Sequence, residues 1–176
     1  MLKSVKNLVR EESTMSRVAR YAALSLVIML VACRGAQAPM TDAQRSTIRD
    51  ALIATHNEML ASASAVDADG LFSHFVDNRN GVLAYDGALI VTRESALKGL
   101  REAYSGLEKI HFTMDEEHVS VISPETAVYT GLGKSSTLTK AGETIDAPFA
   151  VSIVFVLRDG EWKVLHLHES LPNPAL

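Results

Sequence analysis

The order of apolar and polar positions predicts helices in the first half of the chain and strands in the second. From residue 41 onward, apolar positions recur at steps of three and four, on a stripe that includes Leu52 and one histidine, His56. This is the period of a helix that buries one face. Thr41 and Gln44 have the spacing of a capping box, so we expect the helix to begin there and to run to about Ala65.

Two further helices and a hairpin are predicted before residue 105. Asp67 begins a short helix, and Thr92 can cap another that covers residues 93–104. Between these helices, two apolar runs flank Asp86 and Gly87, a pair that is typical of a tight turn between two strands. The pattern therefore predicts three helices and one short hairpin before the long strands begin.

From residue 109 to residue 170 the chain has mostly the pattern of strands. Runs rich in Thr, Val, Ile and aromatic residues are separated there by turn residues. Asp159 and Gly160 form a two-residue turn, which sets how the last two strands pair. The pairs that follow are Leu157 with Trp162, Phe155 with Val164, Ile153 with His166 and Val151 with His168.

This register assigns each side chain of the last hairpin to one of two faces. One face is apolar near the turn and becomes polar at the far end, in His166, His168 and Ser170. The other face has charged margins around an apolar centre, which is typical of an interface. That centre consists of Val154, Val156, Leu165 and Leu167. A bulge anywhere in the hairpin would exchange the two faces.

Composition narrows the possible classes of protein. Of the 176 residues, 47% are hydrophobic and 22% are charged, which is the range of one globular domain. The chain has 17 basic and 21 acidic residues and a net charge of -4, so we expect no nucleic-acid partner. Cys33 is the one cysteine, which rules out an internal disulfide and a zinc site built from several cysteines.

The first 33 residues have the form of an export signal. Residues 21–33 carry no charge and follow Arg17 and Arg20, and this run is too short to span a bilayer but suits a signal peptide. It ends in Leu-Val-Ala-Cys, which resembles the lipobox of bacterial lipoproteins. The expected organisation is a signal peptide over 1–33 with a lipid attached to Cys33, a linker over 34–40, a domain over 41–172 and a tail over 173–176.

Two alternatives to the lipid anchor stay open. A soluble exported form would be cut after Ala38, at an A-x-A site, and an uncleaved anchor would keep the whole segment. All three place the domain on the periplasmic side of the cell envelope. Translation could start at Met15 rather than at Met1. Cleavage before Cys33 removes five basic and two acidic residues and leaves 144 residues with a net charge of -7.

The order of the elements and the closing strand resemble a known superfamily. The pattern D-G-x-W-x-[IV]-x-x-x-H-x-S is matched by Asp159, Gly160, Trp162, Val164, His168 and Ser170. Over about 42–171, the chain resembles the nuclear transport factor 2-like superfamily and most of all its SnoaL-like domains. The resemblance implies an α+β cone, in which N-terminal helices pack in the concave face of a strongly curved, mostly antiparallel sheet. It also implies a pocket at the open end and a homodimer through the outer sheet face.

The resemblance further implies that the pocket binds a small, largely apolar molecule. Enzymes of the superfamily include isomerases, cyclases and dehydratases, so we expect no cofactor and, if the chain is an enzyme, proton transfer next to a carbonyl. Other members have no chemistry, and a non-catalytic dimerisation or adaptor module is the alternative. The sequence leaves open whether the pocket catalyses a reaction.

Candidate site residues are the polar and aromatic side chains that such a fold would bring to the pocket. His168, His166 or Asp146 would be the base. The expected ligand contacts are Ser170, Tyr85, Tyr129, Tyr104, His56, Phe72, Phe75 and Trp162. Two histidines at alternate positions of one strand are too few ligands for a metal, so we expect no metal site. We interpret one further polar cluster as solvated surface. It consists of His111, Asp115, Glu116, Glu117 and His118.

Overall fold

The computed structural model describes residues 39–77, 82–85 and 87–171. The predicted signal peptide, Cys33 and the predicted tail lie outside these residues, as does Asp86 of the predicted turn. The elements are the helices α2 (Asp42–Ser64), α3 (Ala68–Ser73) and α4 (Arg93–Tyr104) and the strands β1 (Leu83–Tyr85), β2 (Ala88–Ile90), β3 (Leu107–Ser123), β4 (Thr126–Thr139), β5 (Thr144–Arg158) and β6 (Glu161–Ser170). None of the helices described has both the length and the hydropathy of a membrane span.

Each helix begins where the sequence predicts, because a local cap sets its first residue. At the start of α2, the Gln44 N–H donates to Thr41 Oγ1 at 3.2 Å and the Thr41 N–H donates to Gln44 Oε1 at 2.9 Å, which completes the capping box. Asp67 caps α3 and Thr92 caps α4, and each side chain accepts from the backbone N–H three residues later. The predicted starts of all three helices are confirmed.

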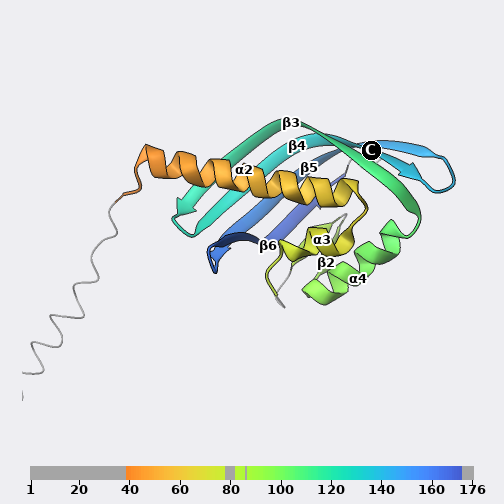
Figure 1. Cartoon of the computed structure of the whole chain (residues 1–176), viewed down its shortest axis with the longest axis horizontal. Coiled ribbons are helices and arrows are strands. Elements are labelled where there is room, and N and C mark those ends of the chain that lie inside the picture. Colours follow the sequence, from red (N-terminus) through yellow and green to blue (C-terminus); the bar gives the residue numbers. More distant parts are fainter. Residues whose placement is uncertain (1–38, 78–81, 86, 172–176) are drawn as a thin grey trace, which may run out of the picture. The chain divides into compact units, whose positions relative to one another are not determined.

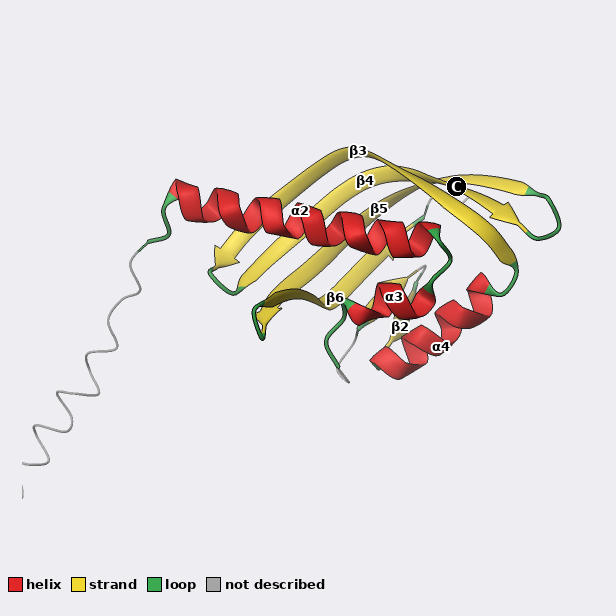
Figure 2. Ribbon diagram, viewed as in Figure 1, coloured by secondary structure: helices red, strands yellow, loops and turns green. Residues whose placement is uncertain are grey.

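The strands form one sheet in the order β2-β1-β6-β5-β4-β3. Neighbouring strands run antiparallel, except that β1 is parallel to β6. Figure 1 and Figure 2 show the sheet curving around the helices, which lie on one of its faces. This is the α+β arrangement expected from the sequence, with helices packed in the concave face of a curved, mostly antiparallel sheet.

The core fills the space between the helices and the inner face of the sheet. Its largest fully buried side chains include Tyr129 and Phe155 from the sheet and Leu52 from α2. Phe72 stacks on Phe75, with ring centroids 4.5 Å apart, on the side of α3. Burial of these side chains supplies much of the free energy that holds the helices on the sheet.

The last hairpin keeps its predicted register only as far as the pair Phe155 and Val164. The next pair is Val154 with His166, so Leu165 is the extra residue of a bulge in β6. The bulge exchanges the two faces for the rest of the strand, because side chains alternate with a period of two. The predicted pairs beyond Val164 are therefore wrong.

Beyond this bulge, β6 turns different side chains toward the inside. Leu167 lies opposite Ile153, and Glu169 lies opposite Val151, and both of these β5 side chains are buried. The outer face takes the polar residues His166, His168 and Ser170. Leu167 is thereby lost from the predicted apolar centre of the outer face.

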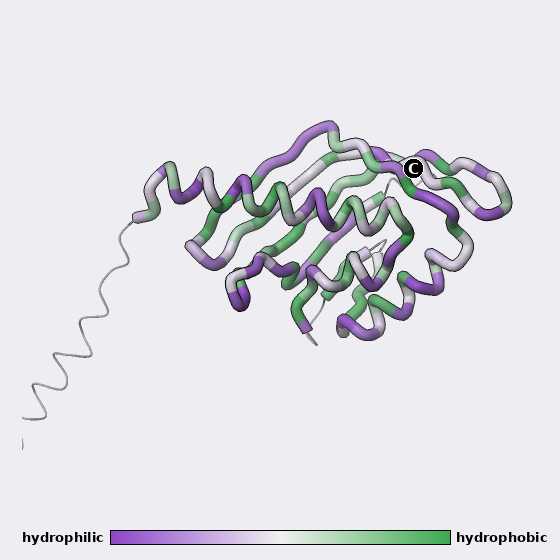
Figure 3. The backbone as a smooth tube through the Cα atoms, viewed as in Figure 1, coloured by the Kyte–Doolittle hydropathy of each residue, from purple (hydrophilic) through white to green (hydrophobic). Residues whose placement is uncertain are grey.

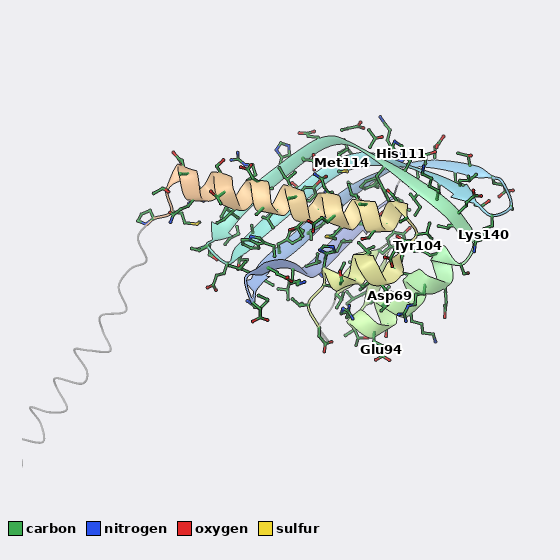
Figure 4. The ribbon with its side chains drawn as sticks, viewed as in Figure 1. Asp69, Glu94, Tyr104, His111, Met114 and Lys140 are labelled. Atoms are coloured by element: carbon green, nitrogen blue, oxygen red, sulfur yellow. The ribbon has the colours of Figure 1, made fainter. Side chains whose placement is uncertain are left out.

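A second bulge lies in the middle of β3. Between Met114 and Glu116, β3 has one residue more than β4. As a result Glu117, and not Glu116, faces inward, opposite Gly131. Met114 lies midway along β3 (Figure 4), and the stretch after it is hydrophilic (Figure 3). Glu117 stays solvent-exposed, as the interpretation of this stretch as solvated surface expects, but its carboxylate also accepts a hydrogen bond from the buried Tyr129.

Candidate functional site

A cavity of about 460 Å³ lies between the helices and the inner face of the sheet. Its wall is mainly apolar, and its volume is typical of pockets that bind small molecules. The polar side chains in the wall are those of His56, Tyr85, Tyr104, Ser135, Thr137 and Glu169. Within the part of the chain that the structure describes, Glu169 is the one carboxyl group in the wall, and no lysine or arginine is in it.

His56 lines the cavity from the buried stripe of α2. Its side chain is 3% exposed, and its Nδ1 lies 3.7 Å from Oε1 of Glu117, beyond hydrogen-bond length. Nδ1 has no hydrogen-bond partner among the described residues. Burial lowers the pKa of His56 to about 4, and the nearby Glu117 carboxylate offsets only part of this effect. The imidazole is therefore neutral at neutral pH, and its contact with Glu117 is not an ion pair there.

Glu117 is held in place by a tyrosine. The Tyr129 hydroxyl donates to Oε1 of Glu117 at 2.8 Å. The ring of Tyr129 packs on that of His56, with centroids 4.2 Å apart and planes at 36°. Burial raises the pKa of Tyr129, and the hydrogen bond to Glu117 raises it further, so the hydroxyl keeps its proton. The three side chains form one connected group, of which His56 reaches the cavity.

Gly131 has no side chain, which leaves room for the contact between Tyr129 and Glu117. Gly131 lies opposite Glu117 and two residues after Tyr129, on the same face of β4. A Cβ atom at this position would lie 2.8 Å from the Tyr129 hydroxyl and 2.7 Å from Cε of Met114. Tyr129 therefore leans over Gly131 to reach Glu117.

Glu169 lines the cavity on the side of β6 and β1. Tyr85 lies opposite Glu169 in the parallel pairing of these strands, and both residues are part of the cavity wall. Tyr104, the last residue of α4, lines the cavity from the helix side (Figure 4). Burial raises the pKa of the Glu169 carboxyl. Burial also raises the pKa of Tyr104 to about 12, and the negative charges of Glu169 and Asp67 add to this rise.

The structure brings several of the expected ligand contacts together. The cavity is lined by His56, Phe72, Phe75, Tyr85 and Tyr104. Tyr129 lies against His56 and is fully buried. Trp162 packs against the edge of the core and is not part of the cavity wall.

The residues proposed as the base lie elsewhere. His166 and His168, with Ser170, lie on the outer face of β6, because of the bulge at Leu165. Asp146 is exposed on β5. In residues 39–77, 82–85 and 87–171, no three His, Cys, Asp or Glu side chains are grouped to hold a metal ion.

Glu117 and Glu169 are the two site residues that the predicted faces missed. A signal for both is present in the sequence, since the apolar positions in the middle of β3 are even from Ile110 to Met114 and odd at Val119 and Val121. The apolar positions of β6 change in the same way after Val164. A change of parity within one strand marks a bulge, because alternate side chains share a face.

Comparison with known proteins identifies a family for most of the described chain. The family model of the SnoaL-like domain matches residues 52–174. No curated protein matches the chain in sequence.

Several solved structures have the same fold. A nuclear transport factor 2-like superfamily protein from Salmonella enterica is 16% identical, with a TM-score of 0.67 over 75% of this chain and 96% of its own. The hexachlorocyclohexane dehydrochlorinase LinA type 3 from Novosphingobium barchaimii is 15% identical, with a TM-score of 0.64 over 76% of this chain and 92% of its own. The association domain of CaMKII from C. elegans is 21% identical, with a TM-score of 0.60 over 74% of this chain and 99% of its own. At these identities the similarity shows the fold alone.

Proposed function

The chain belongs to the SnoaL-like domain family, and we propose that its cavity binds a small, largely apolar molecule. The observation that carries the proposal is the cavity of about 460 Å³ with its mainly apolar wall. A ligand is stabilised there because it leaves water, by ~25 cal/mol for each Å² of apolar surface buried. A hexachlorocyclohexane dehydrochlorinase shares the fold, which supports an apolar ligand. We expect His56 to contact an uncharged polar group of the ligand.

The same geometry offers the neutral His56 as a proton acceptor, and its pKa of about 4 makes it a weak one. Nδ1 lies toward the Glu117 carboxylate, which leaves Nε2 for the ligand. A proton taken from a C–H bond beside a carbonyl would move to Nε2, and the electron pair would stay on the ligand as an enolate. The Glu117 carboxylate would stabilise the imidazolium so formed, and the hydrogen bond from Tyr129 keeps that carboxylate in place. We therefore include proton transfer in the proposal.

Calorimetry with 4-phenylbutan-1-ol tests the binding step. In the full chain, kept in one nonionic detergent, we expect a single saturable site. His56→Leu should weaken binding by about tenfold, because it removes the nitrogen that accepts from the hydroxyl. Glu116→Gln is the matched control, since Glu116 is an exposed neighbour of Glu117 that does not face the inside. A wild-type chain without saturable binding would contradict the proposal.

Deuterium uptake tests the proton transfer. The ligand is 4-phenylbutan-2-one in D2O, and NMR measures how fast deuterium replaces the hydrogens beside the carbonyl. We expect the wild-type chain to accelerate exchange by about 100-fold or more, and His56→Leu to return the rate to that of buffer. Glu117→Gln should lower the rate, and Glu116→Gln should not. Acceleration that survives in His56→Leu would exclude His56 as the base.

We further propose that the domain is exported and carries a lipid at Cys33. The support is the uncharged run over 21–33 and its lipobox-like end. In bacteria fed an alkyne-labelled fatty acid, the wild-type protein should be labelled and membrane-bound, and Cys33→Ala should lose the label. Unlabelled wild-type protein in the membrane would favour the uncleaved anchor. Unlabelled soluble protein would favour cleavage after Ala38.

A homodimer through the outer sheet face is a separate proposal. Its support is the association domain that shares the fold. The apolar centre of that face is smaller than predicted, because Leu167 lines the cavity, but Val154 and Leu165 are still half-buried on β5 and β6. Light scattering of the full chain should give a dimer, and Val154→Asp should give a monomer. A monomeric wild-type chain would reject both this dimer and the adaptor alternative that depends on it.

A further inference from the structure

Glu169 and two tyrosines form what we call the polar corner of the cavity. Tyr85 lies opposite Glu169 in the pairing of β1 with β6, and both line the cavity. Tyr104 lines it from α4, and the negative charge of Glu169 acts on its hydroxyl. A carboxylate beside two aromatic rings suits an ammonium group, because the charge and the faces of the rings both attract a cation.

No cation of the protein neutralises Glu169 in the part of the chain that the structure describes. No lysine or arginine of that part lines the cavity, and none of its side chains forms a hydrogen bond or an ion pair with the Glu169 carboxyl. Glu117, in contrast, accepts a hydrogen bond from Tyr129. Because an isolated buried carboxylate is costly, a bound cation would gain from supplying the missing countercharge.

We propose that the polar corner binds the ammonium group of a small amine with an apolar body. The inference rests on the proposed function, because the body of the amine fills the same cavity. A neutral head group would leave the Glu169 charge without a partner among the residues that the structure describes, and an anionic head group would be repelled by it. The cavity thus selects a chemical class of ligand and not only a size.

The strand pairing also indicates how such an amine would lie. One residue from each long strand forms a row across the sheet, namely Glu117, Gly131, Val151 and Glu169. Three strand spacings therefore separate the backbones of Glu117 and Glu169, roughly 14 Å along the sheet. His56 lies beside Glu117. With its ammonium group at Glu169, an amine would direct the other end of its body toward His56, where we propose proton transfer.

Three probes that share one apolar body test the head group. They are 4-phenylbutylamine, which is a cation at neutral pH, the neutral 4-phenylbutan-1-ol and the anionic 4-phenylbutanoate. By calorimetry on the full chain, we expect the amine to bind about tenfold or more tightly than the alcohol, and the acid to bind most weakly. Glu169→Gln should remove the advantage of the amine and leave the affinity for the alcohol within about twofold.

Matched variants separate the role of Glu169 from a general effect of charge. Glu161→Gln removes one negative charge from the exposed start of β6 and should leave the preference for the amine unchanged. Tyr104→Leu should weaken amine binding by about threefold because it removes a ring face, and Tyr104→Phe should not. These tyrosine variants test the polar corner even if Glu169→Gln does not fold.

The outcomes distinguish the two proposals. If the alcohol binds and the amine binds no more tightly, the ammonium site is wrong and the cavity proposal stands. If the amine keeps its advantage in Glu169→Gln, the ammonium site is also wrong. If none of the three probes binds to the wild-type chain, the proposed function fails and the ammonium site fails with it.

Discussion

The bulges in β3 and β6 change the backbone in the same way, since each adds one residue to its strand. The glutamates that follow them differ in their neighbours. Each bulge turns one glutamate inward and leaves a neighbouring histidine on the outer face. The pairs are Glu117 with His118 in β3 and Glu169 with His168 in β6. Glu117 meets a hydrogen-bond donor in Tyr129, whereas Glu169 meets an apolar wall and two tyrosines.

This difference shows that the neighbours of an inward carboxylate, more than the backbone that carries it, decide its role. With a donor at 2.8 Å, Glu117 is held in place near His56, 3.7 Å from its Nδ1. Without a donor among the described residues, Glu169 is desolvated, and burial raises the pKa of its carboxyl. The first is suited to support chemistry, and the second is suited to receive a ligand.

The largest effect is expected in the pH dependence of stability, because burial lowers the pKa of His56 near Glu117. The unfolded chain protonates His56 near its ordinary pKa of 6.5 and the folded chain only near 4, so acid favours the unfolded state. About 3 kcal/mol of stability at neutral pH should be lost as the pH falls from 6.5 to 4. Denaturant unfolding at pH 7 and pH 4 should show this extra loss in the wild-type chain relative to His56→Leu. Equal losses would contradict it.

A side chain at Gly131 should separate Tyr129 from Glu117. Gly131→Ala places a Cβ atom within 2.8 Å of the Tyr129 hydroxyl, and we expect a cost of about 2 kcal/mol. The control is Gly99→Ala, because a Cβ atom at Gly99 of α4 has no neighbour within 4 Å and alanine favours a helix. Urea unfolding should therefore give opposite signs for the two variants. A neutral Gly131→Ala would show that Tyr129 does not need this space.

Loss of the hydroxyl alone should have a smaller effect. Tyr129→Phe keeps the ring that packs on His56 and removes the donor to Glu117, so we expect a cost of about 1 kcal/mol. A double-mutant cycle with Glu117→Leu, which removes the acceptor oxygens, measures the pair, and the two changes should be less than additive. Strict additivity would mean that the hydrogen bond contributes nothing.

The smallest effect is expected when each of the two glutamates is replaced by glutamine. The free energy of unfolding should then change in opposite directions for β3 and β6. Because burial raises the folded-state pKa of Glu169 above its ordinary 4.5, its contribution to stability falls as the pH rises through that raised pKa. Glu169→Gln should therefore increase the free energy of unfolding by up to about 1 kcal/mol at pH 8 and not at pH 4. Glu117→Gln should decrease it. Melting curves without amine test this, and a loss of stability in Glu169→Gln at pH 8 would show that Glu169 is satisfied by the chain itself.

The starts of the helices were predictable to the residue because their signals are local. Thr41, Asp67 and Thr92 each accept from a backbone N–H three residues later, and α4 covers Arg93–Tyr104 as the sequence predicts. Such a contact depends on the next few residues and not on the rest of the fold. The stripe of α2 likewise places His56 inside, since its period needs no partner.

The faces of β3 and β6 were less predictable, because each depends on the pairing with a neighbouring strand. Up to Val164 the register follows from the turn at Asp159 and Gly160, which is local. Beyond Val164 it depends on the bulge at Leu165, and that bulge exists only against β5. The prediction that His168 is the base depended on a register without this bulge, in which His168 faces the pocket.

The sequence alone therefore specifies the α+β class, the helix starts and the succession of helices and strands along the chain, and its N-terminal run predicts export. The tertiary structure decides which side chains of the bulged strands face inward, and hence that Glu117 meets Tyr129 while Glu169 faces the cavity. The reason is physical. One extra residue exchanges the faces of a strand, and the pKa of the carboxyl it turns inward depends on desolvation by groups that are distant in the sequence.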